Sequence, residues 1–509
     1  MSFRVLVHCT DLTISLDTAP LASHVTFSVP AGAIVCLVGG NGCGKSTLLD
    51  AIHRRSGNRP EPEFVAGPLL RGHLQVTSGL SVAYLPQSVS SAEPGMSLPP
   101  DRFGTTMRIA ADFGMIDPER PLAQLSPGEL QKAALARVIC SDADLLLLDE
   151  PTNYLDIDGL AALEYHLDQQ RRRGAGVLLV THDRALTDTC ADETVLLTRE
   201  RSYRVPGGAT LVWGAREDDL QSRTRQAGQI RRTIQKLQAD VQRRTTWAYR
   251  KEQSKRGSGL ERSFIAKRAA KMAKRAKVVE QFAEKERQRL LQIKPFVPKR
   301  VHLMLAARTV PNRRVFSLSG AAYSYAAGQP LLEDVSFGAS TRDKICLMGS
   351  NGSGKSTLLR LVTGTLQPTA GTAERNDAVA VAEVAQDLDS FFRHTTLIEN
   401  FVDCPIAETE IRRVLGAVQI RQDKVHEPVE SFSRGELMRA AIAKCLLHRA
   451  EFLILDEPTS HLDIESIRVL EDVLGEFDGG FLIVSHDRVF VAAVAETLYV
   501  IENRTVRLA

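Results

Sequence analysis

The sequence predicts an α/β protein with two domains of the same fold, joined by an antiparallel pair of long helices. Three observations lead to this prediction. A glycine-rich segment with the same spacing of residues occurs twice, 310 residues apart. In both places it follows a short apolar run, which is typical of a buried parallel strand. Between the two copies, residues 221–300 are rich in Lys and Arg and carry apolar residues at helical spacing.

Length and composition exclude several classes of protein. The chain has 509 residues, 43% hydrophobic and 25% charged, which is enough for about three domains of roughly 150 residues. No run approaches the roughly 18 apolar residues of a membrane span, and residues 1–4 lack the basic start of a secretory signal. The eight cysteines are scattered, without a C-x-x-C pair or zinc-ligand spacing. These features favour a cytoplasmic protein with reduced thiols, and we expect Cys36 and Cys346 to be small buried residues.

Each glycine-rich segment lies within a strand-loop-helix pattern. Residues 34–38 read IVCLV and lead into GGNGCGKST, and residues 345–348 read ICLM and lead into GSNGSGKST. This is a P-loop, in which backbone N–H groups face a phosphate, the lysine contacts phosphate oxygens and the serine ligates Mg²⁺. The pattern predicts nucleotide-binding residues at Gly39, Asn41, Gly42, Gly44, Lys45, Ser46 and Thr47, and at Gly349, Asn351, Gly352, Gly354, Lys355, Ser356 and Thr357.

A second apolar run in each copy ends in two carboxylates, Asp149 and Glu150 in the first and Asp456 and Glu457 in the second. Ligands bind at the carboxyl edge of the strands in an open α/β sheet. We therefore expect each aspartate to hold Mg²⁺ and each glutamate to polarise an attacking water as a catalytic residue. A capped strand end at the surface would explain one such pair, but not two at the same place in a repeat.

A helix-start pattern precedes each carboxylate pair by 23 residues. Ser126 is followed three residues later by Glu129, and Ser433 by Glu436, which is the pattern of a capping box. In the first copy Pro127 occupies the first helical position. A cap of this kind is usually structural, but such a helix N-terminus also binds anions.

In this order the motifs resemble those of ATP-binding-cassette ATPases, over both halves of the chain. The serine-led caps are similar to the family's LSGGQ signature, with Ser126 and Gly128 in one copy and Ser433 and Gly435 in the other. Gln87 and Gln386 fall where its Q-loop lies, and His182 and His486 where its switch histidine lies.

The resemblance implies two ATP sites, each shared between the P-loop of one copy and the signature of the other. One pairs Lys45, Ser46, Gln87, Asp149, Glu150 and His182 with Ser433 and Gly435. The other pairs Lys355, Ser356, Gln386, Asp456, Glu457 and His486 with Ser126 and Gly128. It also implies that the serines, glutamines and aspartates hold Mg²⁺, and that both histidines take part in catalysis.

The chain departs from the family pattern at a few positions. Pro127 and Arg434 replace the first signature glycine, and glutamates replace its glutamine, so the two sites can differ in rate. Tyr325 lies where the family carries an aromatic residue that stacks on adenine, whereas the first copy has Leu16 in this stretch. Leucine can pack against adenine but cannot stack on it.

The segment between the copies reads as a basic helical hairpin. Residues 221–300 hold 24 Lys and Arg against 6 Asp and Glu, whereas the rest of the chain holds 40 against 55. Apolar residues repeat at 4-3-4 spacing on either side of the glycines at 257 and 259, which predicts a coiled coil of about 35 residues in each helix, roughly 50 Å long. Pro295 and Pro298 are expected to end the second helix.

A charge run is usually a solvated helix face, but this excess is one-sided and favours a polyanionic partner. The aromatic residues near the expected tip are equally consistent with stacking on bases or with holding the hairpin together: Trp247, Tyr249 and Phe264.

Tandem copies, a basic hairpin and the stretch DEPTNYLD at residues 149–156 together resemble the ABC-F family, whose members carry DEPTNHLD and bind ribosomes. Tyr154 replaces the histidine in the first copy, and the second keeps His461 after Ser460. The resemblance implies cassettes at residues 1–212 and 301–509, a hairpin at 213–300, a monomeric protein, and contacts with ribosomal RNA and tRNA near the peptidyl-transferase centre, but none with membranes or DNA.

Alternatives remain within and outside this family. Ribosome protection against antibiotics is favoured over a housekeeping role in translation, because the first copy has no inserted arm and only 23 residues follow His486. An ATPase subunit of an importer is the main alternative outside translation, although the spacing from P-loop to signature is short. A DNA-repair ATPase would show zinc-binding cysteine pairs, and a chromosome-structural one a far longer coiled coil within a single cassette.

Overall fold

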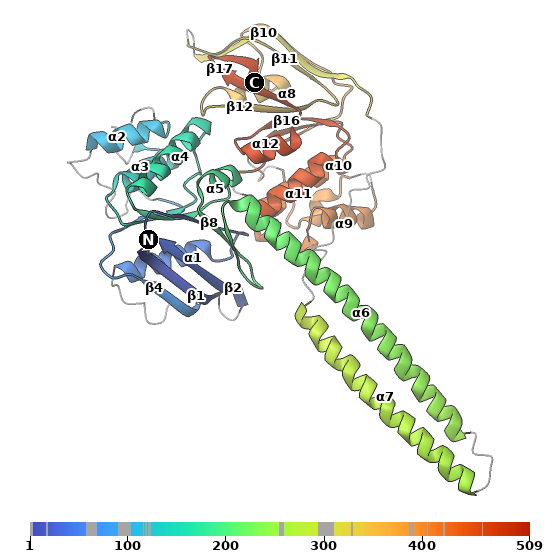
Figure 1. The fold of residues 1–509 in the computed structure, drawn as a ribbon. Helices are drawn as coiled ribbons and strands as arrows, with labels where there is room; N and C mark the ends of the chain where they lie inside the picture. The colour runs from blue at the N-terminus through green and yellow to red at the C-terminus, as the bar shows by residue number, and fades with distance from the viewer. Residues whose placement is uncertain are drawn as a thin grey trace. The chain divides into compact units, whose positions relative to one another are not determined.

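The computed structural model describes residues 4–16, 19–57, 69–89, 103–115, 117, 120, 124–253, 259–293, 310–326, 329–385, 388, 391–404, 406–420, 423–460 and 462–509. It divides into two compact units. One comprises residues 1–212 and 300–509 and contains both copies of the repeat, and the other comprises residues 213–299. Figure 1 shows the two copies and the hairpin by colour along the chain.

The first copy is built on two sheets. A three-stranded antiparallel sheet has the order β2-β1-β4, with β1 Val5–Leu16, β2 Ala19–Pro30 and β4 Leu69–Val76. A six-stranded sheet has the order β5-β6-β7-β3-β8-β9, and it is parallel except for the last strand. Its strands are β3 Ile34–Gly39, β5 Val82–Leu85, β6 Leu145–Asp149, β7 Gly176–Val180, β8 Glu193–Leu197 and β9 Tyr203–Pro206.

The helices of the first copy are α1 Lys45–Ser56, α2 Phe103–Asp112, α3 Pro127–Cys140, α4 Ile157–Arg172 and α5 Arg184–Cys190. The parallel strands explain the apolar runs of the sequence, because both faces of the sheet are covered. In β6, Leu146 and Leu148 pack in the core that α2 to α5 cover, whereas Leu145 and Leu147 pack against α1 and the antiparallel sheet. Each such fully buried leucine stabilises the fold by about 2 kcal/mol.

The second copy repeats this plan. Its antiparallel sheet has the order β11-β10-β13, formed by β10 Arg314–Ala326, β11 Gln329–Ser340 and β13 Ala370–Arg375. The six-stranded sheet has the order β14-β15-β16-β12-β17-β18. Its strands are β12 Lys344–Gly349, β14 Val381–Val384, β15 Phe452–Asp456, β16 Gly480–Val484, β17 Thr497–Glu502 and β18 Thr505–Leu508. The helices are α8 Lys355–Thr363, α9 Glu408–Ala417, α10 Arg434–Leu447, α11 Ile464–Gly475 and α12 Arg488–Val494, with short 3-10 turns at Ile398–Phe401, Lys424–His426 and Val429–Ser431.

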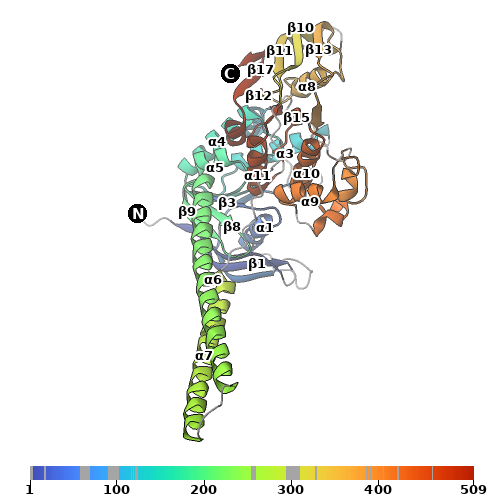
Figure 2. The same cartoon turned by 90° about the vertical axis from the view of Figure 1, so that its right-hand side faces the viewer.

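Two long helices, α6 Ala209–Gln253 and α7 Gly259–Ile293, form the segment between the copies, and they lie antiparallel and side by side in Figures 1 and 2. Four positions of the predicted apolar line are buried, since Ile230, Ile234, Ala276 and Ala283 are each at most 9% exposed. Four others are half-buried: Leu237, Val241, Met272 and Val279. The guanidinium of Arg268 in α7 lies 5.9 Å from the centroid of the Trp247 ring in α6. The side chain of Phe264, and Pro295 and Pro298, lie outside the described residues.

The predicted α/β fold with two copies and a helical hairpin is therefore confirmed. All eight cysteines are free and buried, as expected for Cys36 and Cys346. No helix in the described part of the chain is both long and apolar enough to cross a membrane.

Candidate nucleotide-binding site

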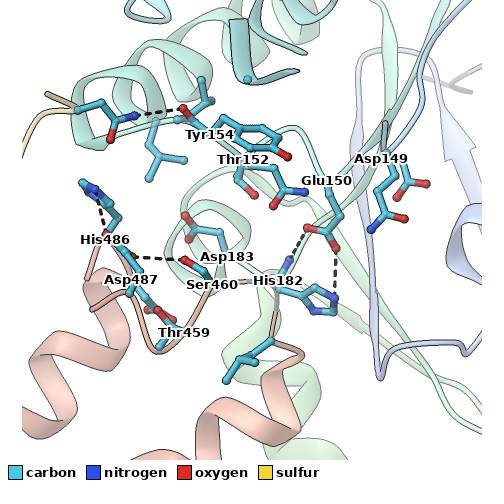
Figure 3. A pocket seen from close by; sticks show the side chains of 18 of the residues that line it. Asp149, Glu150, Thr152, Tyr154, His182, Asp183, Thr459, Ser460, His486 and Asp487 are labelled. Carbon is cyan, nitrogen blue, oxygen red and sulfur yellow. Dashed lines mark hydrogen bonds and ion pairs between the residues drawn. The ribbon is translucent and has the colours of Figure 1, made fainter. Parts of the chain in front are cut away.

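A cavity of about 1160 Å³ is lined by residues of both copies of the repeat. Figure 3 shows that side chains from the two copies face one another across it. From the first copy the wall includes Asn41, Gly42, Gly44, Lys45, Ser46, Thr47, Gln87, Ser126, Gly128, Asp149, Glu150 and His182. From the second it includes Asn351, Gly352, Gly354, Lys355, Ser356, Thr357, Asp456, Glu457 and His486. Residues that the sequence places more than 300 positions apart thus surround one space.

The two glycine loops have the same local geometry. Gly44 and Gly354 precede α1 and α8 with φ angles of 90° and 103°, a left-handed conformation that favours glycine. A Cβ at Gly44 would also lie 2.8 Å from Cγ2 of Ile14. The Nζ of Lys45 donates hydrogen bonds to the carbonyl oxygens of Gly39 and Gly40, at 2.8 and 3.1 Å. The ammonium group is therefore held within the loop, beside the helix N-terminus where a phosphate binds.

The aspartate of each carboxylate pair is suited to a cation. Asp149 is 1% exposed, and neither of its carboxylate oxygens has a hydrogen-bond partner. Burial raises its pKa, and burial likewise raises the pKa of Asp456. In the second copy the hydroxyl of Ser356 lies 3.5 Å from Oδ2 of Asp456. A buried carboxylate beside a serine hydroxyl provides the oxygen ligands that Mg²⁺ prefers.

Each glutamate of the pairs faces a histidine. The Nε2 of His182 lies 3.2 Å from Oε1 of Glu150, and its backbone N–H donates to Oε2 at 3.3 Å (Figure 3). The Nε2 of His486 lies 3.2 Å from Oε1 of Glu457 in the same way. Oε1 of neither glutamate has an aligned hydrogen-bond donor. In both copies, therefore, Oε1 of the glutamate is buried close to the histidine ring.

Burial shifts the protonation of these four groups. It raises the pKa of Glu150 to about 8 and that of Glu457 to about 7. Burial, with the nearby lysine ammonium, lowers the pKa of His182 to about 3 and that of His486 to about 4. Near neutral pH the ligand-free site therefore holds neutral histidines and partly or mostly protonated glutamates.

The same two glutamates have unusual backbone geometry. Glu150 and Glu457 have φ angles of 50° and 48°, in the left-handed region that residues other than glycine rarely adopt. The backbone N–H of each donates to the neighbouring strand, at Val180 and Val484, which holds the strained turn in place. Strain of this kind clusters at functional sites, where the surrounding structure enforces it.

The predicted capping boxes are present at the starts of α3 and α10. Ser126 and Gly128 line the cavity together with Lys355 of the opposite copy. Ser433 and Gly435 do not line it. Gly435 lies against Ser466 and Leu462 of its own copy, because a Cβ at Gly435 would be 2.8 Å from the hydroxyl of Ser466.

Other predicted site residues lie away from the cavity wall. Gly39 and Gly349 end strands β3 and β12 and do not line it. Tyr325 is 63% exposed and also outside the lining, although its hydroxyl lies 3.2 Å from Oγ1 of Thr357. Leu16 does line the cavity. Gln386 and His461 lie outside the described residues.

Sequence reasoning missed the residues that link the copies. Asp156 accepts a hydrogen bond from the backbone N–H of Asn351 at 2.8 Å, and Asp463 accepts one from the N–H of Asn41 at 3.1 Å. The side-chain amide of Asn351 also donates to the carbonyl oxygen of Tyr154, at 3.3 Å. A usable signal existed, since both aspartates follow their glutamates by six residues in the repeat.

Ion pairs reinforce the same interface. Arg184 of α5 pairs with Glu471 of α11, and Arg488 of α12 pairs with Glu164 of α4, so the two contacts are equivalent by the repeat. Arg184 is only 6% exposed. If one copy moves relative to the other, these two ion pairs must therefore either break or move with it.

This arrangement can perform phosphoryl transfer to water. Lysines and helix N-termini are placed to hold phosphates, aspartates to hold a divalent cation, and glutamates to orient a water for in-line attack. Because the groups come from both copies, a nucleotide bound in the cavity would contact both.

Comparisons with known proteins agree with this chemistry. The family model described as "ABC transporter" matches residues 22–153 and 332–460. "ATP-binding protein Uup" of Haemophilus influenzae is 30% identical over 543 aligned positions, which cover 98% of this chain and 79% of that protein. "Ribosome protection protein VmlR" of Bacillus subtilis is 27% identical, covering 98% of this chain and 87% of that protein.

Solved structures share the fold. The crystal structure of the complex of archaeal ribosomal stalk protein aP1 and archaeal ribosome recycling factor aABCE1 matches with a TM-score of 0.60 at 18% identity, covering 99% of this chain and 89% of that one. A structure of RNase-L Inhibitor matches with a TM-score of 0.60 at 18% identity, covering 98% and 89%.

Proposed function

This chain belongs to the ABC-F family of ATP-binding-cassette ATPases, and from that membership we propose that it binds ribosomes and moves its basic hairpin there by an ATP-driven cycle. A similar protein carries the name ribosome protection protein, and a structural match is a ribosome recycling factor. These likenesses supply the ribosome as the candidate partner. The hairpin supplies the means of binding it.

The observation that carries the proposal is the charge of α6 and α7. Basic side chains are exposed along both helices: Arg231, Arg232, Lys236, Arg243, Arg250, Lys267, Arg268, Lys271, Lys274, Arg275 and Lys277. Residues 221–300 hold only 6 acidic residues against 24 basic ones, so pairing within the hairpin cannot neutralise them. Phosphates of ribosomal RNA or tRNA would do so, with release of counterions. The predicted coiled coil would hold these charges on one stiff element.

In the ATP cycle we assign the following roles. Lys45 and Lys355 hold phosphate oxygens, Glu150 and Glu457 orient the attacking water, and His182 and His486 contact the γ-phosphate. Ser46, Gln87 and Asp149, with Ser356, Gln386 and Asp456 in the second site, would hold Mg²⁺. Bound there, Mg²⁺ neutralises phosphate charge. The ion fits the first site because the buried oxygens of Asp149 have no other partner.

We further propose that ATP closes the two cassettes, residues 1–212 and 301–509, and that closure drives residues 213–300 as one lever. One chain supplies both P-loops and both signatures, so a monomer suffices. A partner in translation places the protein in the cytoplasm.

We propose ribosome protection against antibiotics as the specific role, with a housekeeping role in translation as the alternative. These two roles are distinguished by measuring protein synthesis in vitro, with and without drugs that bind the peptidyl-transferase centre. Protection predicts that the protein restores synthesis on drug-inhibited ribosomes and leaves drug-free synthesis unchanged. A housekeeping factor would instead alter synthesis without any drug. A separate assay compares the rate of ATP hydrolysis with and without ribosomes. An unchanged rate would contradict the proposal that the protein acts on ribosomes.

A further inference from the structure

Each signature helix carries a carboxylate where the resemblance expects a neutral glutamine. Glu129 stands at the third position of α3, and Glu436 at the third position of α10. A negative charge at a helix N-terminus stabilises the helix. The same charge repels the phosphates that an ATP site must admit, so these glutamates need an explanation.

Each glutamate accepts a hydrogen bond from the hydroxyl of the signature serine in its own copy. The Ser126 hydroxyl donates to Oε2 of Glu129 at 2.8 Å, and the Ser126 backbone N–H donates to the same oxygen at 2.9 Å. In the second copy the Ser433 hydroxyl and N–H donate to Oε2 of Glu436 at 3.0 and 2.8 Å. Each serine hydroxyl therefore donates its hydrogen bond within its own capping box. A phosphate would have to compete with the glutamate for this hydrogen bond.

Both glutamates are also paired with a cation from the segment that precedes the signature. Arg120 forms a short ion pair with Oε1 of Glu129, the oxygen that the serine does not use. Lys424 donates to Oε1 and Oε2 of Glu436 at 2.9 and 2.8 Å, and its ammonium lies 4.6 Å from the centroid of the Phe432 ring. One cation is an arginine and the other a lysine, yet both reach the same carboxylate in the repeat.

These contacts hold both carboxylates in the charged form. Hydrogen bonds from Ser126 lower the pKa of Glu129, and Arg120 adds to the effect. Burial alone would raise the pKa of Glu436, but hydrogen bonds from Lys424 and Ser433 hold it below its ordinary value. A full negative charge therefore stands beside each signature serine, in direct contact with its paired cation.

We propose that Arg120 and Lys424 are positioning residues that neutralise the signature glutamates, and that they thereby lower the repulsion that the phosphates of ATP meet at the signature serines. This inference rests on the proposed sharing of each nucleotide between the two copies. Ser126, Gly128 and Glu129 line the cavity that both P-loops line. In the proposed sharing, the nucleotide that they would contact is the one on the second P-loop.

The proposal differs from a mechanism in which Arg120 and Lys424 contact the phosphates directly. A cation that touched the phosphate would matter whatever residue stood at position 129 or 436. A cation that acts through the glutamate becomes dispensable once the glutamate is glutamine. Glutamine also serves in a capping box, so this exchange keeps the start of the helix intact.

The test is a double-mutant cycle read by ATP binding without ribosomes. In an E150Q/E457Q background, which prevents turnover, ATP and Mg²⁺ are titrated by calorimetry into the full chain. R120M/K424M is expected to weaken ATP binding about fivefold, in the range of a lost charge-assisted pair. With E129Q/E436Q added, the same two changes are expected to have no effect. E129Q/E436Q alone should bind ATP at least as tightly as the background.

The control is R204M, which removes another arginine paired with a glutamate, Glu193, away from the cavity and should leave binding unchanged. An equal loss in the glutamate and glutamine backgrounds would overturn the proposal in favour of direct contact. No loss in either background would overturn it as well. Because no ribosome is present, the result does not depend on whether the chain binds one.

Discussion

The carboxylate of Asp156 joins two elements that are far apart in the sequence. Its Oδ1 accepts a hydrogen bond from the N–H of Gly159 at the start of α4, and its Oδ2 accepts one from the N–H of Asn351 in the opposite glycine loop. Asp463 repeats both contacts, with Ser466 at the start of α11 and with Asn41. A single side chain in each copy therefore caps a helix and reaches the other P-loop.

The two contacts of Asp156 can be separated by substitution. D156N keeps an oxygen that can cap α4, but the NH2 that replaces Oδ2 cannot accept from the N–H of Asn351. We expect D156N to change the free energy of unfolding by less than about 1 kcal/mol and to lower ATP turnover severalfold. Steady-state phosphate release and thermal unfolding measure the two effects.

D156A is the matched comparison, because it loses the cap as well and should cost a further ~1 kcal/mol of stability. D463N should repeat the result of D156N at the other P-loop. Full ATP turnover in D156N/D463N would show that these contacts between the copies do not serve the cycle.

The protonation of the buried glutamates predicts a pH dependence of stability. Burial raises the pKa of Glu150 from 4.5 to about 8 and that of Glu457 to about 7. Their favourable contribution is complete below about pH 4.5 and is lost as the pH rises through 7 to 8. The midpoint of thermal unfolding without nucleotide should therefore fall more steeply between pH 5.5 and 8 in the wild type than in E150Q/E457Q.

The histidines act in the opposite sense. Because the pKa of each is lowered, their contribution is present above about pH 6.5 and is lost as the pH falls through about 4. They remain in both proteins and cancel in the comparison. Identical pH profiles for the wild type and E150Q/E457Q would refute the shifted glutamate values.

The two equivalent ion pairs between the copies should differ in strength. The side chains of Arg184 and Glu471 are 7% and 17% exposed, whereas those of Arg488 and Glu164 are 36% and 20% exposed. R184A removes a buried arginine from a half-buried glutamate and should cost about 3 kcal/mol. R488A should cost about 1 kcal/mol or less, because water screens that pair.

Denaturant unfolding of the single variants and of R184A/E471A measures this difference. The double variant should recover part of the loss, since Glu471 is no longer left unpaired and only the longer contact of Arg184 with Asp487, at 3.8 Å, stays broken. Equal costs for R184A and R488A would mean that burial does not set the strength of these pairs.

Exposed lysines of the hairpin should set the salt dependence of RNA binding. K267Q/K271Q/K274Q removes three exposed charges from α7 and none of its buried residues. If all three contact phosphates, the slope of log affinity against log salt should become shallower by roughly 2 to 3. Sedimentation with ribosomes over a series of KCl concentrations gives the slope.

R173Q/R199Q/R507Q removes three exposed charges from the cassettes and serves as the control. It should leave the slope closer to that of the wild type. The hairpin assignment fails if the control changes the slope as much as the triple lysine variant does.

Local patterns carried most of what could be predicted. The P-loops, the apolar strands that end in carboxylates and the two capping boxes are each encoded within a dozen residues, and they lie where the sequence placed them. The buried line of the hairpin, including Ile234 and Ala276, also followed from spacing alone.

What escaped prediction depends on packing between distant segments. Asp156 and Asn351 are 195 residues apart, and Arg184 and Glu471 are 287 residues apart, so no local pattern pairs them. The partners of Glu129 and Glu436 were missed for a related reason. Arg120 and Lys424 lie at different distances from their glutamates, nine and twelve residues, which hides their equivalence in the repeat. The exposure of Tyr325 outside the cavity wall likewise has no local signal in the sequence.

The central claim is that ATP-bound, closed cassettes dock this protein on the ribosome through its basic hairpin. Sedimentation of E150Q/E457Q through a sucrose cushion with ribosomes and ATP tests it most directly, because these changes keep Asp149 and Lys45 for nucleotide binding while removing the water-orienting carboxylates. The account predicts that the variant pellets with ribosomes in ATP, less so in ADP, and is released at high salt. A variant that binds ATP yet stays in the supernatant at low salt would contradict the account and favour another partner for the two cassettes.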